Sequence, residues 1–134
     1  YIDSLKSTVG EALLKPHINY TNHVFNILEK NIEIKGIAHI TGGGLTENIP
    51  RILPDNCSVK IKKNTWPKLE LFSVLQNLGN VDEDEMFHAF NMGIGMVFII
   101  NKNSIINIKE ALEGVSPLYE IGEVIEGKNL VFYD

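Results

Sequence analysis

Three consecutive glycines, Gly42 to Gly44, separate two segments whose hydrophobic patterns have different periods. Residues 32–40 alternate between two faces, which predicts a β-strand that ends just before the glycines. Four apolar side chains after the glycines follow helical spacing: Leu45, Ile49, Ile52 and Leu53. Pro50 lies inside that pattern, so we expect a short helix with a break or a tightened turn near it. The segment therefore predicts a strand, a glycine loop and a helix start.

The predicted loop has the features of an anion site. Glycine lets a ligand approach the backbone closely, and the first turn of a helix leaves N–H groups without partners. The loop is neither a Gly-Lys-Ser/Thr phosphate loop nor a G-x-G-x-x-G dinucleotide fingerprint. Arg51, the only arginine in the chain, follows closely and can bind a phosphate through two donors at once. We predict phosphate binding by Thr41, Gly42, Gly43, Gly44 and Arg51. The alternative is a plain tight turn.

Two further side chains are candidate catalytic residues. The strand pattern places His39 beside the loop, where it can donate to a bound phosphate or carry a proton. The alternative for His39 is a hydrogen bond to a loop carbonyl. Asn91 begins a run that contains Gly93 and Gly95, and such glycines allow close approach to the backbone. The alternative for Asn91 is a glycine bulge that leads into a core strand.

The rest of the chain alternates short helices and strands. Helices are predicted over residues 22–30, 67–78 and 105–113, with a further helix that starts at Asp82 and carries His88, and strands over 58–62, 96–100, 118–125 and 130–133. The strand at 96–100 is continuously apolar, so we expect it to be central and buried on both faces. The last two strands are expected to form a hairpin, and Trp66 to fill the core. The pattern predicts an α+β fold: a mixed sheet of about four to six strands with packed helices.

The composition argues against several classes of function. The chain has 134 residues, a formal net charge of −5 and no lysine cluster interleaved with aromatic residues, so nucleic acid is not an expected partner. Its one cysteine, Cys57, allows no internal disulfide. No apolar run is long enough to span a bilayer, so we expect a cytoplasmic protein without a membrane partner. The acidic run Asp82–Glu85 is interpreted as a helix start, and no metal ligand is predicted.

Residues 39–54, HITGGGLTENIPRILP, resemble the signature of the aminoimidazole-ribonucleotide synthetase family, also called phosphoribosylformylglycinamidine cyclo-ligases. Residues 85–96 are similar to a second family signature, and Trp66-Pro67 to a motif between the two. The likeness covers nearly the whole chain but only the C-terminal half of the family's protein. It implies that Asn48, which matches an asparagine of the first signature, contacts the substrate through an amide that can donate and accept.

The resemblance also implies a domain division and a reaction. Residues 10–134 would form a C-terminal synthetase-type domain, and residues 1–9 a residual linker from a missing N-terminal domain. The start at Tyr1 rather than methionine agrees with a fragment of a longer polypeptide. The family uses ATP to close the imidazole ring of formylglycinamidine ribonucleotide in purine biosynthesis. ATP and Mg²⁺ would be held mainly by the N-terminal half, which also forms a homodimer.

The expected partners are therefore a phosphoribosyl substrate and the N-terminal domain of the same polypeptide, and the chain alone is expected to be inactive. Two alternatives stay open. One is the equivalent domain of another superfamily member, of the thiamine-monophosphate kinase or selenophosphate synthetase type. The other is a stand-alone module that binds a phosphoribosyl ligand.

Overall fold

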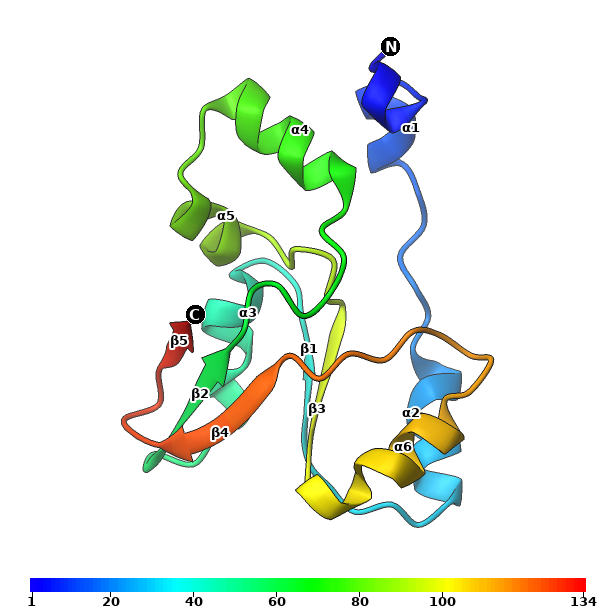
Figure 1. Cartoon of the computed structure of the whole chain (residues 1–134), viewed down its shortest axis with the longest axis vertical. Coiled ribbons are helices and arrows are strands. Elements are labelled where there is room, and N and C mark those ends of the chain that lie inside the picture. The colour runs from blue at the N-terminus through cyan, green and yellow to red at the C-terminus, as the bar shows by residue number, and fades with distance from the viewer.

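The computed structural model describes all 134 residues and contains six α-helices and five strands (Figure 1). The helices are α1 (Val9–Leu13), α2 (Thr21–Glu29), α3 (Gly44–Asn48), α4 (Glu70–Gly79), α5 (Glu83–Ala89) and α6 (Ile105–Ala111). The strands are β1 (Ile34–His39), β2 (Cys57–Ile61), β3 (Met96–Ile100), β4 (Gly122–Glu126) and β5 (Val131–Tyr133). Short 3₁₀ turns lie at Asp3–Leu5, Pro50–Ile52 and Lys102–Ser104. The α+β class is confirmed.

The strands form two sheets rather than the single sheet expected. In one, β1 pairs antiparallel with β3; in the other, β2 lies between β4, which is antiparallel to it, and β5, which is parallel. The predicted β4–β5 hairpin is therefore wrong. The segment that joins these strands wraps around the start of β2, where Leu130 N–H donates to the fully buried Ser58 Oγ at 3.1 Å. The strands β4 and β5 therefore lie on opposite edges of β2.

The prediction that residues 96–100 form a central strand is also wrong, since β3 has one neighbour and all five of its residues are half-buried. Its two faces contact different hydrophobic clusters. Val97 and Ile99 pack against the main core, whereas Phe98 and Ile100 pack against a smaller cluster. A strand placed between two cores needs apolar side chains on both faces, which accounts for the unbroken apolar sequence.

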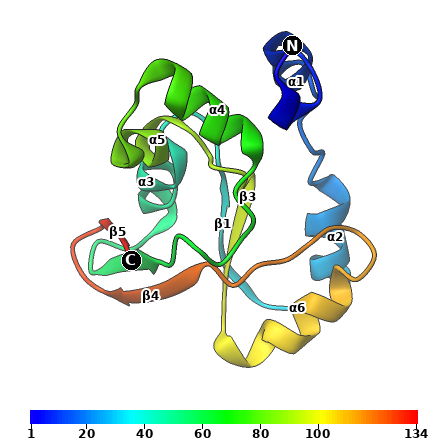
Figure 2. The same cartoon turned by 45° about the horizontal axis from the view of Figure 1, so that its top comes forward.

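The main core lies under α3, α4 and α5, and the smaller cluster lies under α2 and α6 at the other end of the β1–β3 ladder (Figures 1 and 2). Ile40 and Leu45, on either side of the glycines, are completely buried in the main core. Trp66 fills the core as predicted, and its indole N–H donates to the carbonyl of Met92 at 2.9 Å. The glycine loop is thus held at both ends by buried side chains.

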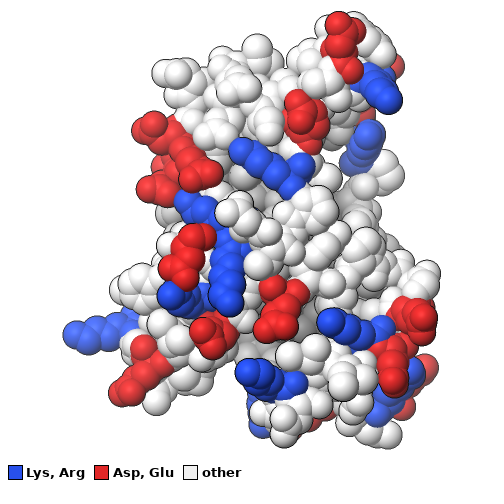
Figure 3. Space-filling model, viewed as in Figure 1, with Lys and Arg blue, Asp and Glu red and all other residues white.

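Lysine and arginine side chains are interspersed with acidic ones over the face shown in Figure 3. The acidic run at the start of α5 is partly neutralised, because Lys63 Nζ lies 3.1 Å from Glu83 and 3.4 Å from Asp84. The ammonium group also lies over the ring of Phe87, 4.8 Å from its centroid. The start of α5 is therefore an ion-paired helix end.

Candidate functional site

The three glycines have different surroundings. Gly42 is exposed, and a Cβ added there would meet no atom within 4 Å. Gly43 has a φ of 92°, a left-handed conformation that other residues adopt at a cost. Gly44, with a φ of 56°, is buried, and a Cβ added there would overlap the carbonyl oxygens of Phe87 and Phe90. Gly44 is thus required for packing of α3 against the end of α5, while Gly42 faces open space.

The backbone N–H groups of the three glycines also differ in whether they have a hydrogen-bond partner. Gly44 N–H donates to the carbonyl of Thr41 at 3.1 Å, so its amide is already engaged. The N–H groups of Gly42 and Gly43 donate to no acceptor in the chain. Two free donors on adjacent residues remain for a ligand. The phosphate contact predicted for the amide of Gly44 would require this bond to break, and it stays a prediction.

Asn48 is buried, and its side chain turns back to the loop. Its Nδ2 lies 2.8 Å from the carbonyl oxygen of Gly44 and 3.1 Å from that of Gly42. Its Oδ1 accepts from Thr41 Oγ1 at 3.4 Å. Both ends of the amide are therefore used within the protein, and Asn48 holds the loop in shape. Direct contact with a substrate, as the sequence suggested, would require it to leave these partners.

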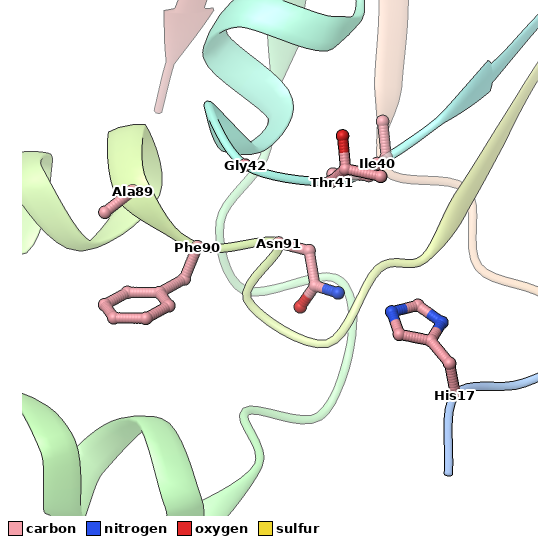
Figure 4. A pocket seen from close by; sticks show the side chains of 7 residues that line it. All are labelled: His17, Ile40, Thr41, Gly42, Ala89, Phe90 and Asn91. Atoms are coloured by element: carbon pink, nitrogen blue, oxygen red, sulfur yellow. The ribbon is translucent and has the colours of Figure 1, made fainter. Parts of the chain in front are cut away.

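A cavity of about 360 Å³ opens beside the loop (Figure 4). Its lining residues come from three parts of the chain: His17, Ile40, Thr41, Gly42, Ala89, Phe90 and Asn91. The cavity brings together two predicted site regions, the glycine loop and Asn91. Asn91 Oδ1 accepts from Gly93 N–H at 3.0 Å, while its Nδ2 has no partner in the chain. Figure 4 shows the Asn91 side chain directed toward His17.

His39 lies at the end of β1, as predicted, but it is exposed and does not line the cavity. Its ring meets the ring of His17 edge-on, with centroids 5.8 Å apart, and lies 6.3 Å from the ring of Tyr20. His17 itself was not predicted. It belongs to no motif, and only the tertiary path of the segment before α2 brings it to the cavity.

Arg51 is exposed, and the structure places it next to Glu47 rather than in the cavity. Arg51 Nη2 lies 3.7 Å from Glu47 Oε2, and His88 Nε2 lies 3.2 Å from the other carboxylate oxygen. A Cβ on Gly43 would overlap the Glu47 side chain, so the carboxylate lies directly against the loop. A negative charge therefore borders the free amides, and the Arg51 guanidinium partly balances it.

No group of three or more His, Cys, Asp or Glu side chains is placed to hold a metal ion. None of the helices combines the length and the apolar character needed to cross a membrane. The unpartnered polar groups on the cavity wall include the amide of Gly42 and the Nδ2 of Asn91, both donors, and the free amide of Gly43 lies next to them on the loop. An open, donor-rich cavity beside a glycine loop in an α+β domain is typical of domains that bind small anionic molecules.

Comparison with known proteins identifies the domain. A family model described as "AIR synthase related protein, C-terminal domain" matches residues 2–134, and the chain belongs to this family. The class α+β and the resemblance found from the sequence agree with this match. The match includes most of residues 1–9, where the structure has a 3₁₀ turn and the start of α1 at Val9. The proposed linker boundary stays a prediction.

Relatives include proteins named phosphoribosylformylglycinamidine cyclo-ligase. That of Crocosphaera subtropica is 51% identical over 122 residues, which are 90% of this chain and 36% of the relative. That of Acetivibrio thermocellus is 45% identical over 128 residues, 95% of this chain and 37% of the relative. That of Pseudothermotoga lettingae is 42% identical over 129 residues, 96% of this chain and 38% of the relative. The chain spans little more than a third of the length of these relatives.

Proposed function

We propose that this chain supplies the phosphate-binding wall of the substrate site in an ATP-dependent cyclo-ligase that forms aminoimidazole ribonucleotide from formylglycinamidine ribonucleotide. The family match and the names of the relatives support the reaction class. The observation that carries the site is the pair of unpartnered amides, Gly42 N–H and Gly43 N–H, on a loop beside an open cavity.

The chemistry of ring closure suits such a wall. ATP would phosphorylate the formamide oxygen of the substrate. The neighbouring nitrogen would then attack the carbon that carries this oxygen, and the oxygen would leave as phosphate. The substrate's own ribose phosphate stays negatively charged throughout, and fixed N–H donors on the loop can hold it without having to reorient. Because both reacting atoms belong to one substrate, orientation contributes more than a protein nucleophile would. Thr41, Gly42, Gly43 and Asn91 are the residues to which we assign binding.

The other predicted residues take more distant roles in this proposal. His39 lies outside the cavity, where its ring contacts His17 and can exchange a proton with a ligand bound in the cavity. Arg51 contributes positive charge behind the loop, balanced by Glu47 in the free chain. Asn48 positions the loop through its bonds to Gly42 and Gly44.

We assign ATP and Mg²⁺ to the remainder of the full-length enzyme, as the family resemblance implies, because this chain spans little more than a third of its relatives. The remainder would also provide the homodimer contact and close the cavity from its open side. The isolated chain is then a binding domain without turnover. The cytoplasmic location stays a prediction.

The variant Gly42→Ala tests the site directly. The structure has room for the added methyl group, so folding should be unchanged, but the methyl would crowd the open space in front of the free amides. Titration with inorganic phosphate, followed by the amide NMR signals of residues 41–44, should show binding weakened about tenfold, a loss of roughly 1.4 kcal/mol. Gly10→Ala, in α1, is the control with a methyl added elsewhere. Equal phosphate affinity of Gly42→Ala and the unchanged chain would refute the site.

A further inference from the structure

The segment from Lys15 to Tyr20, which joins α1 to α2, is fastened across the end of the β1–β3 ladder. Tyr20 is its anchor: a Cβ on Gly95 would overlap the Tyr20 hydroxyl, so the absent side chain of Gly95 makes room for the phenol. The Tyr20 ring also meets those of His23 and His39, with centroids 5.2 and 6.3 Å away. Partial burial raises the pKa of Tyr20, in agreement with a half-buried phenol.

His17 lies three residues before this anchor and is fixed at a second point. Its ring meets the ring of His39 at 5.8 Å with an interplanar angle of 83°, an edge-on contact of the kind that aromatic pairs favour. Neither of its nitrogens has a hydrogen-bond partner in the chain. The imidazole is exposed and lies against His39 at the cavity, with its polar atoms available.

The cavity has two polar walls with different chemistry. One wall is the glycine loop, where Gly42 lines the cavity and Gly43 adjoins it, and the amides of both have no partner in the chain. The other is formed by His17 and by Asn91, whose oxygen is occupied by Gly93 N–H and whose Nδ2 can only donate. With a volume of about 360 Å³, the cavity has space for more than a phosphate group. A ligand that reaches both walls carries hydrogen-bonding groups beyond its phosphate, and sugar hydroxyls, which both donate and accept, suit Asn91 Nδ2 and an imidazole.

We propose that His17 is a specificity-determining residue, which together with Asn91 binds the sugar oxygens of a phosphorylated sugar whose phosphate lies on the glycine loop. This role rests on the proposed function above, because the loop must first hold the phosphate. His17 distinguishes a sugar phosphate from free phosphate, and it does so from a segment outside the glycine motif.

Two probes separate this role from phosphate binding itself: inorganic phosphate and ribose 5-phosphate, each titrated into the 134-residue chain at constant pH. Affinities come from the amide NMR signals of residues 41–44, and the ring signals of His17 are followed in parallel. The variants are His17→Ala and its neighbour Ile18→Ala, which is exposed and does not line the cavity. Circular dichroism confirms that each variant is folded.

For His17→Ala we expect binding of ribose 5-phosphate weakened about fivefold, the effect of one lost hydrogen bond, with phosphate affinity unchanged. Ile18→Ala should change neither affinity. In the unchanged chain, ribose 5-phosphate should shift the His17 ring signals and inorganic phosphate should not. If phosphate binds normally but His17→Ala leaves ribose 5-phosphate affinity intact, or weakens both probes equally, the role of His17 is refuted and the loop site stands. If neither probe shifts residues 41–44, the loop site fails, and His17 loses its role with it.

Discussion

The side-chain Nδ2 of Asn48 donates to the carbonyl oxygen of Gly44 at 2.8 Å. This hydrogen bond joins the last residue of α3 to its first. The same nitrogen lies 3.1 Å from the carbonyl of Gly42. In a helix of five residues, this is the main side-chain support of the glycine loop. The loop keeps its two amides free because a buried asparagine occupies the loop carbonyls instead.

Replacement of Asn48 by Asp should therefore destabilise the fold. A carboxylate cannot donate to the carbonyls of Gly42 and Gly44, and a buried charge without a partner is costly. We expect a loss of about 3 kcal/mol in the free energy of unfolding, measured by urea denaturation. Asn22→Asp, at an exposed position of α2, is the matched control. A variant with full stability but impaired ligand binding would instead give Asn48 the direct substrate contact that the sequence suggested.

The glycine loop and Asn48 show what sequence patterns can and cannot predict here. Local rules were sufficient for the loop: three glycines after an alternating segment, and a 3₁₀ turn at Pro50–Ile52 where the helix was expected to tighten. The resemblance implied that Asn48 contacts the substrate, but the side chain turns inward and donates to the loop carbonyls of Gly42 and Gly44. Its burial follows from three-dimensional contacts that periodicity does not contain.

Long-range pairing was the second limit. The β4–β5 segment has the turn residues of a hairpin, and nothing in its own sequence reveals that β2 inserts between the two strands. His17 reaches the cavity only because Tyr20, three residues later, packs against Gly95, which is far from it in sequence but adjacent in space. By contrast, the burial of Trp66 was predictable, since one large apolar side chain before a helix commonly fills a core.

A second prediction concerns Gly44. Any side chain at this position overlaps the carbonyl oxygens of Phe87 and Phe90, and the φ of 56° disfavours a residue with a Cβ. Gly44→Ala should lower the unfolding free energy by about 3 kcal/mol or prevent folding. Gly42→Ala, two residues earlier, should unfold at the same urea concentration as the unchanged chain. Similar stability losses in both variants would contradict the separation of packing and binding roles within the loop.

A third prediction concerns Tyr133, whose hydroxyl lies 2.8 Å from Thr46 Oγ1 and ties β5 to α3. Burial raises the pKa of Tyr133 above its ordinary value. The folded state thus keeps the phenol proton more strongly than the unfolded state, so this contribution to stability is complete below about pH 10 and is lost as the pH rises further. Urea denaturation from pH 8 to pH 11 should show a smaller loss for Tyr133→Phe than for the unchanged chain. Parallel pH profiles would show that Tyr133 ionises equally in both states.

The fourth prediction concerns the carboxylate that borders the loop. Glu47 lies against Gly43, so its carboxylate repels an anion at the free amides. It also lies 3.7 Å from Arg51 and competes with the anion for that guanidinium. Both effects are weakened by solvent, since the side chains are about half exposed. Glu47→Gln keeps the shape and removes the charge, and we expect phosphate binding strengthened about threefold at low salt, with a smaller gain at high salt. Glu29→Gln, at the far end of α2, removes an equal charge away from the loop and should leave the affinity unchanged. If Glu47→Gln instead weakens phosphate binding at both salt concentrations, the carboxylate helps to form the site and the free loop is not restrained by it.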